Sequence, residues 1–130
     1  MIAIGQAAHL SGIGIETIRY YEREGIVDRP ARSQNGRRVY SRADVADLAF
    51  IRRCRDLGFQ LTDVRALLAV SHGREEDCER AREFAAKHLV HVRMKLAELQ
   101  RIEAALSELT RNCAEGSTFC PMLTELRGVP

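Results

Sequence analysis

A long stretch without glycine or proline, which includes Arg74 to Arg111, restricts the possible folds of this chain more than any other feature of the sequence. Apolar residues recur in its second half at alternating spacings near three and four, and charged residues fill many of the other positions. This pattern predicts a long amphipathic helix with a coiled-coil seam. The seam residues are Leu89, Val92, Leu96, Leu99, Ile102, Leu106 and Leu109.

Such a helix would extend about 55 Å at 1.5 Å per residue, which is longer than a small domain is wide. One helix is also too narrow to bury its own seam. Packing on the rest of the same chain is one alternative. The length favours an antiparallel coiled coil between two copies, so we expect a homodimer.

Three cysteines lie near the two ends of this helix: Cys78 at its start, and Cys113 and Cys120 around its end. The 35 residues from Cys78 to Cys113 correspond to about 52 Å of helix, so the three cannot meet within one chain. Two antiparallel helices would bring Cys78 of one subunit to Cys113 and Cys120 of the other. The spacing therefore predicts two equivalent sites at the dimer interface, each with three thiolates.

Thiolates select thiophilic metals such as Zn(II), Cd(II), Hg(II), Pb(II) and Cu(I) over Mg(II) or Ca(II). Six residues including Gly116 separate Cys113 from Cys120 and can curl around a soft cation, and Pro121 then begins a short terminal helix. Three alternatives remain. The cysteines are buried hydrophobes, or Cys113 and Cys120 sense oxidants through a reversible disulfide, or the chain only buffers metal.

One histidine and one further cysteine have to be considered as additional ligands of this site. His72 precedes Gly73 near the start of the long helix and is a candidate fourth ligand or outer partner. Cys54 lies among apolar and arginine residues of another predicted helix, where packing is its expected role.

A different pattern occupies the first 40 residues. Residues 15–26 form an amphipathic stretch in which Arg19, Tyr20 and Tyr21 stand together, and a basic segment with an Asn35-Gly36 turn follows. A short helix with Arg and Tyr before a basic hairpin is what a winged helix-turn-helix uses to hold DNA. The alternative is a pair of core tyrosines beside a solvated basic face.

The charge distribution supports the DNA-binding interpretation. The chain has a net charge of +2, with ten Arg against seven acidic residues in positions 1–58 and ten basic against eleven acidic residues in positions 59–130. Positive charge therefore accompanies the predicted DNA-binding half.

The predicted fold is mainly α, with a winged helix-turn-helix DNA-binding domain followed by a long antiparallel coiled-coil dimerisation helix. We expect the first domain, with its connecting helices, over residues 1–70, the coiled-coil helix over 71–112, and a metal-binding loop and short helix over 113–130. In the first domain we expect helices over 2–10 and 15–24, a hairpin over 30–40, a helix from a Ser41–Asp44 capping box to Gly58, and a helix capped by Thr62 through Leu68.

The N-terminal part resembles the MerR family of bacterial transcription activators. The likeness is carried by Ile4-Gly5-Gln6-Ala7-Ala8, Thr17-Ile18-Arg19-Tyr20-Tyr21-Glu22, Gly25, Arg32, Gly36, Arg38 and Tyr40, and continues through Phe50-Ile51, Leu57-Gly58-Phe59 and Leu61. With the helix and hairpin pattern, it gives these candidates for DNA contact: Thr17, Arg19, Tyr20, Tyr21, Arg32, Arg37, Arg38 and Tyr40.

The resemblance implies a mechanism and a class of metal. Family dimers bind an inverted repeat in a promoter with an overlong spacer, and the metal-bound form distorts it so that RNA polymerase engages both promoter elements. A cysteine at the start of the dimerisation helix, here Cys78, marks sensors of divalent ions and argues against Cu(I). The six-residue loop is similar to the cadmium and lead branch, whereas Cys120-Pro121-Met122-Leu123 is similar to the mercury branch.

No catalytic constellation or cofactor fingerprint occurs in the sequence, so we expect no enzyme activity. No secretory signal precedes the first predicted helix, and no apolar run is long enough to span a membrane. We therefore expect a cytoplasmic protein with promoter DNA and RNA polymerase, and no membrane, among its partners.

Overall fold

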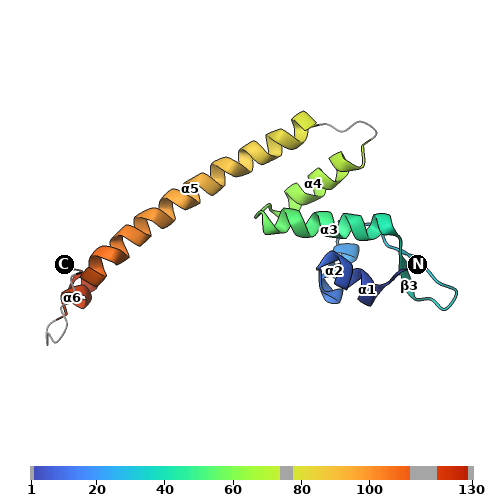
Figure 1. Cartoon of the computed structure of the whole chain (residues 1–130), viewed down its shortest axis with the longest axis horizontal. Coiled ribbons are helices and arrows are strands. Elements are labelled where there is room, and N and C mark those ends of the chain that lie inside the picture. Colours follow the sequence, from blue (N-terminus) through green and yellow to red (C-terminus); the bar gives the residue numbers. More distant parts are fainter. Residues whose placement is uncertain (1, 74–77, 112–119, 129–130) are drawn as a thin grey trace. The chain divides into compact units, whose positions relative to one another are not determined.

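The computed structural model describes residues 2–73, 78–111 and 120–128. It confirms a mainly α chain with a small antiparallel sheet (Figure 1). The elements in chain order are β1 (Ile2–Ala3), α1 (Ile4–Ser11), α2 (Ile15–Arg23), β2 (Ala31–Arg32), β3 (Arg38–Tyr40), α3 (Arg42–Asp56), α4 (Leu61–Ser71), α5 (Cys78–Arg111) and α6 (Pro121–Arg127). They form two compact units, residues 1–85 and residues 86–130.

Helices α1 and α2 make the helix-turn-helix of the first unit. Gly12 ends α1 with a φ of 77°, a left-handed conformation that favours glycine, and its amide donates to the Ala8 carbonyl at 2.9 Å. Ile18, Tyr21 and Glu22 form the buried face of α2. The periodicity of α2 therefore leaves Tyr20 on the outside.

The wing is a three-stranded antiparallel sheet in the order β1-β3-β2. The predicted hairpin is confirmed: Arg32 pairs with Arg38, and the turn closes through the Gly36 amide, which donates to Ser33 at 2.9 Å. The prediction of helix from Ile2 was wrong at its first two residues. Ile2 and Ala3 pair with Tyr40 and Val39, so β3 supplies their backbone partners and the helix begins only at Ile4.

Helix α3 begins as predicted. The Ser41 hydroxyl accepts from the Asp44 amide at 3.0 Å, and the Asp44 carboxylate accepts from the Ser41 amide at 2.9 Å, which completes a capping box. The end at Gly58 is also confirmed, because Gly58 has a φ of 85° and the next amide, of Phe59, donates to Cys54 at 3.1 Å.

The predicted limits of α4 were wrong at both ends. Its N-cap is Gln60, whose backbone is extended and whose carbonyl accepts from Val64 at 3.0 Å, so Thr62 lies inside the first turn. The helix continues past Leu68 to Ser71, because no glycine interrupts it before Gly73.

One hydrophobic core holds α1 to α4 and the sheet together. Its largest fully buried side chains are Ile18 from α2, Leu48 and Ile51 from α3, and Val64 from α4. Ala81 and Phe84, in the first turns of α5, pack against the same cluster. The core therefore fixes the outer face of α2 relative to the wing.

Helix α5 is one unbroken helix in Figure 1. Its seam positions Leu89, Val92, Leu96, Leu99, Ile102 and Leu106 are between 42% and 61% exposed, whereas Leu109 is buried. The predicted start near Arg74 falls on residues outside those described. The predicted helix from Pro121 is confirmed as α6, with the proline in its first turn. Within the described residues, no helix combines the length and apolarity needed to cross a membrane.

Candidate DNA interface and metal ligands

The outer face of α2 carries three of the residues predicted to contact DNA. Thr17 is exposed, Tyr20 is 42% exposed, and Arg19 is half-buried. The Arg19 Nη1 atom donates to Glu16 Oε1 at 2.8 Å, in a pair whose side chains are 41% and 81% exposed. Exposed pairs of this kind contribute little stability. Arg19 can therefore exchange Glu16 for a phosphate at small cost.

The wing adds three arginines. Arg32 is exposed and its Nη1 atom donates to the Gly36 carbonyl at 2.7 Å, which braces the hairpin turn. Arg37 is exposed at the end of that turn. Arg38 is only 30% exposed, and its Nε atom lies 3.0 Å from Glu22 Oε2 of α2. The wing thus presents two exposed arginines and one that is paired with α2.

The structure buries two residues that the sequence had placed among the DNA contacts. Tyr21 and Tyr40 are 8% and 3% exposed and belong to the hydrophobic core. Burial raises the pKa of Tyr40 far above its ordinary value, and the hydrogen bond and charge of Glu22 raise it further. These rings pack against other core side chains, so Tyr21 and Tyr40 are not available on the surface as the other candidates are.

Sequence reasoning missed Arg65, which is exposed on α4. A Cβ atom added at Gly25 would lie 3.7 Å from its Nη2 atom, and Arg65 shares a shallow pocket with Tyr20. Arg65 is therefore a basic group beside the end of α2. No local motif signals it, because α4 is some forty residues from α2 and only the packing of the core brings them together.

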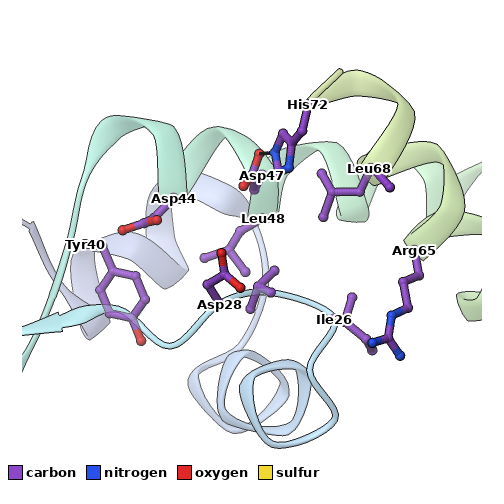
Figure 2. Close-up of a pocket in the computed structure, with 11 residues that line it drawn as sticks. Ile26, Asp28, Tyr40, Asp44, Asp47, Leu48, Arg65, Leu68 and His72 are labelled. Carbon is purple, nitrogen blue, oxygen red and sulfur yellow. Dashed lines mark hydrogen bonds and ion pairs between the residues drawn. The ribbon is translucent and has the colours of Figure 1, made fainter. Parts of the chain in front are cut away.

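A cavity of about 200 Å³ lies between α3, α4 and the segment that follows α2. Figure 2 shows His72, at the end of α4, pointing toward Asp47 of α3. The His72 Nε2 atom is 2.8 Å from Asp47 Oδ1. This contact explains the position of His72 without a metal, so the structure gives no support to its suggested role as a ligand.

Of the three predicted metal ligands, the structure describes Cys78 and Cys120. Cys78 is exposed at the first position of α5, Cys120 is the half-buried N-cap of α6, and Cys113 lies outside the described residues. Among residues 2–73, 78–111 and 120–128, no three His, Cys, Asp or Glu side chains cluster closely enough to hold a metal. Cys54 is buried in α3, and burial raises the pKa of its thiol, as expected of a packing residue.

Comparisons with known proteins agree with this architecture. Residues 2–70 match the family described as MerR HTH family regulatory protein, and residues 45–109 match the family described as MerR, DNA binding. The chain is 37% identical over 129 residues to the mercuric resistance operon regulatory protein of Pseudomonas fluorescens, covering 98% of this chain and 88% of that protein. It is 33% identical over 130 residues to the HTH-type transcriptional regulator ZntR of Escherichia coli K12, covering 97% and 92%.

A solved structure is similar along nearly the same length. The transcription regulator PbrR691 from Ralstonia metallidurans CH34, in complex with lead(II), has a TM-score of 0.80 and 33% identity, covering 97% of this chain and 99% of that chain. These proteins are transcription regulators and not enzymes. The chain therefore belongs to the MerR family of helix-turn-helix transcription regulators.

Proposed function

We propose that this regulator responds to a soft divalent metal ion, Cd(II), Pb(II), Hg(II) or Zn(II). As a homodimer it binds an inverted repeat in a promoter and, when loaded with metal, activates metal-resistance genes by distorting that DNA. The observation that carries the proposal is that Cys78 is the first residue of the 34-residue helix α5, and that Cys120 is the N-cap of α6, which follows α5 in the chain.

DNA binding uses the exposed face of α2 and the wing. Thr17, Arg19 and Tyr20 lie on α2, and Arg32 and Arg37 on the hairpin, all partly or fully exposed. Arginines on a helix and on a wing reach the backbone at two separate places, which fixes the position and orientation of the protein on the duplex. Arg38 joins them through its terminal nitrogens, because its ion pair with Glu22 uses Nε.

Dimerisation covers the α5 seam. Six large apolar residues at coiled-coil spacing are 42% to 61% exposed in the isolated chain. A second copy of the same helix, packed antiparallel, would bury these side chains along the whole length of the seam. A helix of 34 residues is about 51 Å long, so such a dimer places Cys78 of one subunit near the C-terminal cysteines of the other.

The donor set suits a soft ion. Thiolate ligands discriminate strongly against hard cations such as Mg(II) and Ca(II). PbrR691, a relative of 33% identity over nearly the whole chain, was solved with lead(II), and another relative regulates a mercuric resistance operon. Three thiolates, from Cys78 of one subunit and Cys113 and Cys120 of its partner, would hold such an ion.

Activation follows from a choice between two dimer geometries. An ion that binds one geometry more tightly shifts the dimer toward it. Because the two DNA-binding units are joined through the dimer, that shift bends and untwists the promoter spacer, and DNA deformation becomes the signal that RNA polymerase reads.

Metal retention under reducing conditions tests the proposal. Equilibrium dialysis of Cd(II) against the dimer, with a phosphine reductant present, should give two equivalent sites, and Cys78→Ser should weaken both by at least a factor of about 100. Cys54→Ala is the matched control, because that thiol is buried in α3 and should leave the affinity unchanged.

Oxidant sensing through Cys113 and Cys120 is the second candidate, since a reversible disulfide would use the same pair. It predicts that the reduced dimer retains no stoichiometric metal and that Cys78→Ser keeps a full response to peroxide. Either result would replace the metal proposal.

A further inference from the structure

One buried carboxylate lies between the recognition helix and the wing. Glu22 is on α2, and its side chain is only 3% exposed. Among the residues that the structure describes, Glu22 is the only buried one with a charged side chain. Burying a carboxylate is costly unless it is paired and hydrogen-bonded, so its partners are held where they are.

Both partners come from β3. The Tyr40 hydroxyl donates to Glu22 Oε1 at 2.5 Å, whereas Arg38 Nε lies 3.0 Å from Glu22 Oε2 in an ion pair without hydrogen-bond geometry. Residues two apart on a strand point to the same face, so Arg38 and Tyr40 meet α2 together. The Glu22 carboxylate therefore holds β3, the last strand of the wing, against α2.

Glu22 also stands near the second cationic group of this surface. Arg19 precedes it by three residues on α2, which places the two side chains on neighbouring turns. The positive charge of Arg19 partly offsets the rise in the pKa of the Tyr40 hydroxyl, which donates to Glu22. The carboxylate thus pairs with Arg38 of the wing and lies one helical turn from Arg19, although it is itself shielded from solvent.

We propose that Glu22 is a positioning residue for DNA binding. It holds Arg38 through Nε, so that Nη1 and Nη2 point to a backbone phosphate, and it keeps the wing at a fixed distance from Arg19 and Tyr20. The inference rests on the proposed DNA contacts of Arg19 and Arg38, and it assigns a role to a residue that touches no DNA.

A positioning role and a purely electrostatic role of Glu22 predict opposite changes in DNA affinity when the charge is removed. Neutralising an acidic residue near DNA removes a repulsion, so a purely electrostatic role predicts tighter binding by Glu22→Gln. A positioning role predicts weaker binding, because the glutamine no longer anchors the guanidinium and the wing arginines lose their alignment. The sign of the change therefore separates the two explanations.

The experiment uses the full-length dimer without metal and a duplex selected from a random library by the wild-type protein. Binding is measured at several salt concentrations for Glu22→Gln, Arg38→Gln, the double variant and Tyr40→Phe. Glu24→Gln is the matched control, because it removes the same charge from an exposed position at the end of α2. Circular dichroism and thermal melting give the folded fraction of each variant.

We expect Glu22→Gln to lower affinity at least about tenfold and to reduce the slope of log K against log salt by about 0.9, the loss of one phosphate contact. The double variant should bind no more than about twofold more weakly than Arg38→Gln alone. Glu24→Gln should bind as well as wild type or slightly better. If Glu22→Gln fails to fold, Tyr40→Phe carries the test, with an expected three- to fivefold loss.

The proposal would be overturned if folded Glu22→Gln bound DNA as tightly as wild type or more tightly. It would also be overturned if Glu22→Gln were partly unfolded and its folded fraction kept the wild-type affinity and salt slope. Additive effects of Glu22→Gln and Arg38→Gln would overturn it as well. The DNA-contact assignment fails separately, if Arg19→Ala and Arg38→Gln both leave affinity and slope unchanged.

Discussion

At the scale of single residues, Arg19 is a proposed DNA contact that has a defined partner on its own helix. Its guanidinium pairs with Glu16 at 2.8 Å on the exposed face of α2. If Arg19 contacts DNA as proposed, a backbone phosphate has to displace that carboxylate. Arg19→Ala should therefore weaken binding to the selected duplex and lower the salt slope by about 0.9.

Glu16→Gln should have the opposite effect. The substitution removes a competitor for the Arg19 guanidinium and one negative charge near the phosphates, so affinity should rise about twofold. Fluorescence anisotropy at a fixed salt concentration measures both variants. A tighter Arg19→Ala protein, or a Glu16→Gln protein that binds several-fold more weakly, would contradict the assignment of Arg19.

Tyr40 makes a prediction about pH. Burial and the Glu22 carboxylate raise the pKa of Tyr40 above the ordinary value of 10.0, so the folded state binds the phenolic proton more tightly than the unfolded state. Its contribution to stability is complete below about pH 10 and declines as pH rises beyond that value, by at most about 1.4 kcal/mol per pH unit.

Tyr40→Phe should therefore lose less stability than wild type between about pH 9 and pH 11. Urea midpoints at the two pH values provide the measurement, and the other titrating groups are common to both proteins. Equal losses in the two proteins would show that Tyr40 ionises in the folded state as readily as in the unfolded chain.

At the scale of elements, the first turns of α3 and α4 offer two substitutions whose effects on stability can be compared. Ser41 closes a capping box at the start of α3, whereas Thr62 lies inside the first turn of α4 without a capping contact. Ser41→Ala should cost about 1 kcal/mol of unfolding free energy, and Thr62→Ala should cost a few tenths at most. Thermal or urea unfolding of the two variants would contradict this assignment if Thr62→Ala were the more destabilising.

The helices and the hairpin could be predicted because their signals are local. A capping box, a turn dipeptide and a proline in the first turn each act within a few residues, and Ser41, Gly36 and Pro121 occur where the structure uses them. The α4 start was misplaced because Thr62 has the right chemistry for a cap, but the extended backbone of Gln60 begins the helix first.

Other features depend on contacts between distant parts of the chain. Strand β1 has only two residues, too few for a periodic pattern, and exists because β3 pairs with it. Burial of Tyr21 and Tyr40 cannot be told from exposure by residue type, since tyrosine suits both a core and a DNA-facing surface. Glu22 and Arg65 depend on partners from other elements, which no spacing in the sequence reveals.

At the scale of the whole molecule, the shared metal site can be tested with a mixed dimer. One subunit carries Cys78→Ser, and the other carries Cys113→Ser and Cys120→Ser. If each site combines Cys78 of one subunit with the two C-terminal cysteines of its partner, the mixed dimer keeps one intact site and loses the other. Each homodimeric variant should lose both.

Two different affinity tags allow purification of the mixed dimer, and dialysis against Cd(II) counts its sites. One tight site in the mixed dimer and none in either homodimer is the expected result. A mixed dimer without a tight site would show that the ligands do not cross between subunits in this way.

The choice of metal tests the central claim most directly. A reporter promoter, with the selected operator in the spacer between its two polymerase-recognition elements, is transcribed in vitro with RNA polymerase and chelator-buffered Cd(II), Pb(II), Hg(II), Zn(II) or Cu(I). Cd(II) or Pb(II) should activate at lower free concentration than Zn(II), with Hg(II) as the main competitor. Cu(I) should be ineffective, because the extra negative charge of a third thiolate is uncompensated beside a monovalent ion. Cys78→Ser should lose the response to the divalent ions. A wild-type promoter that responds to Cu(I) and to none of the four divalent ions would contradict the account.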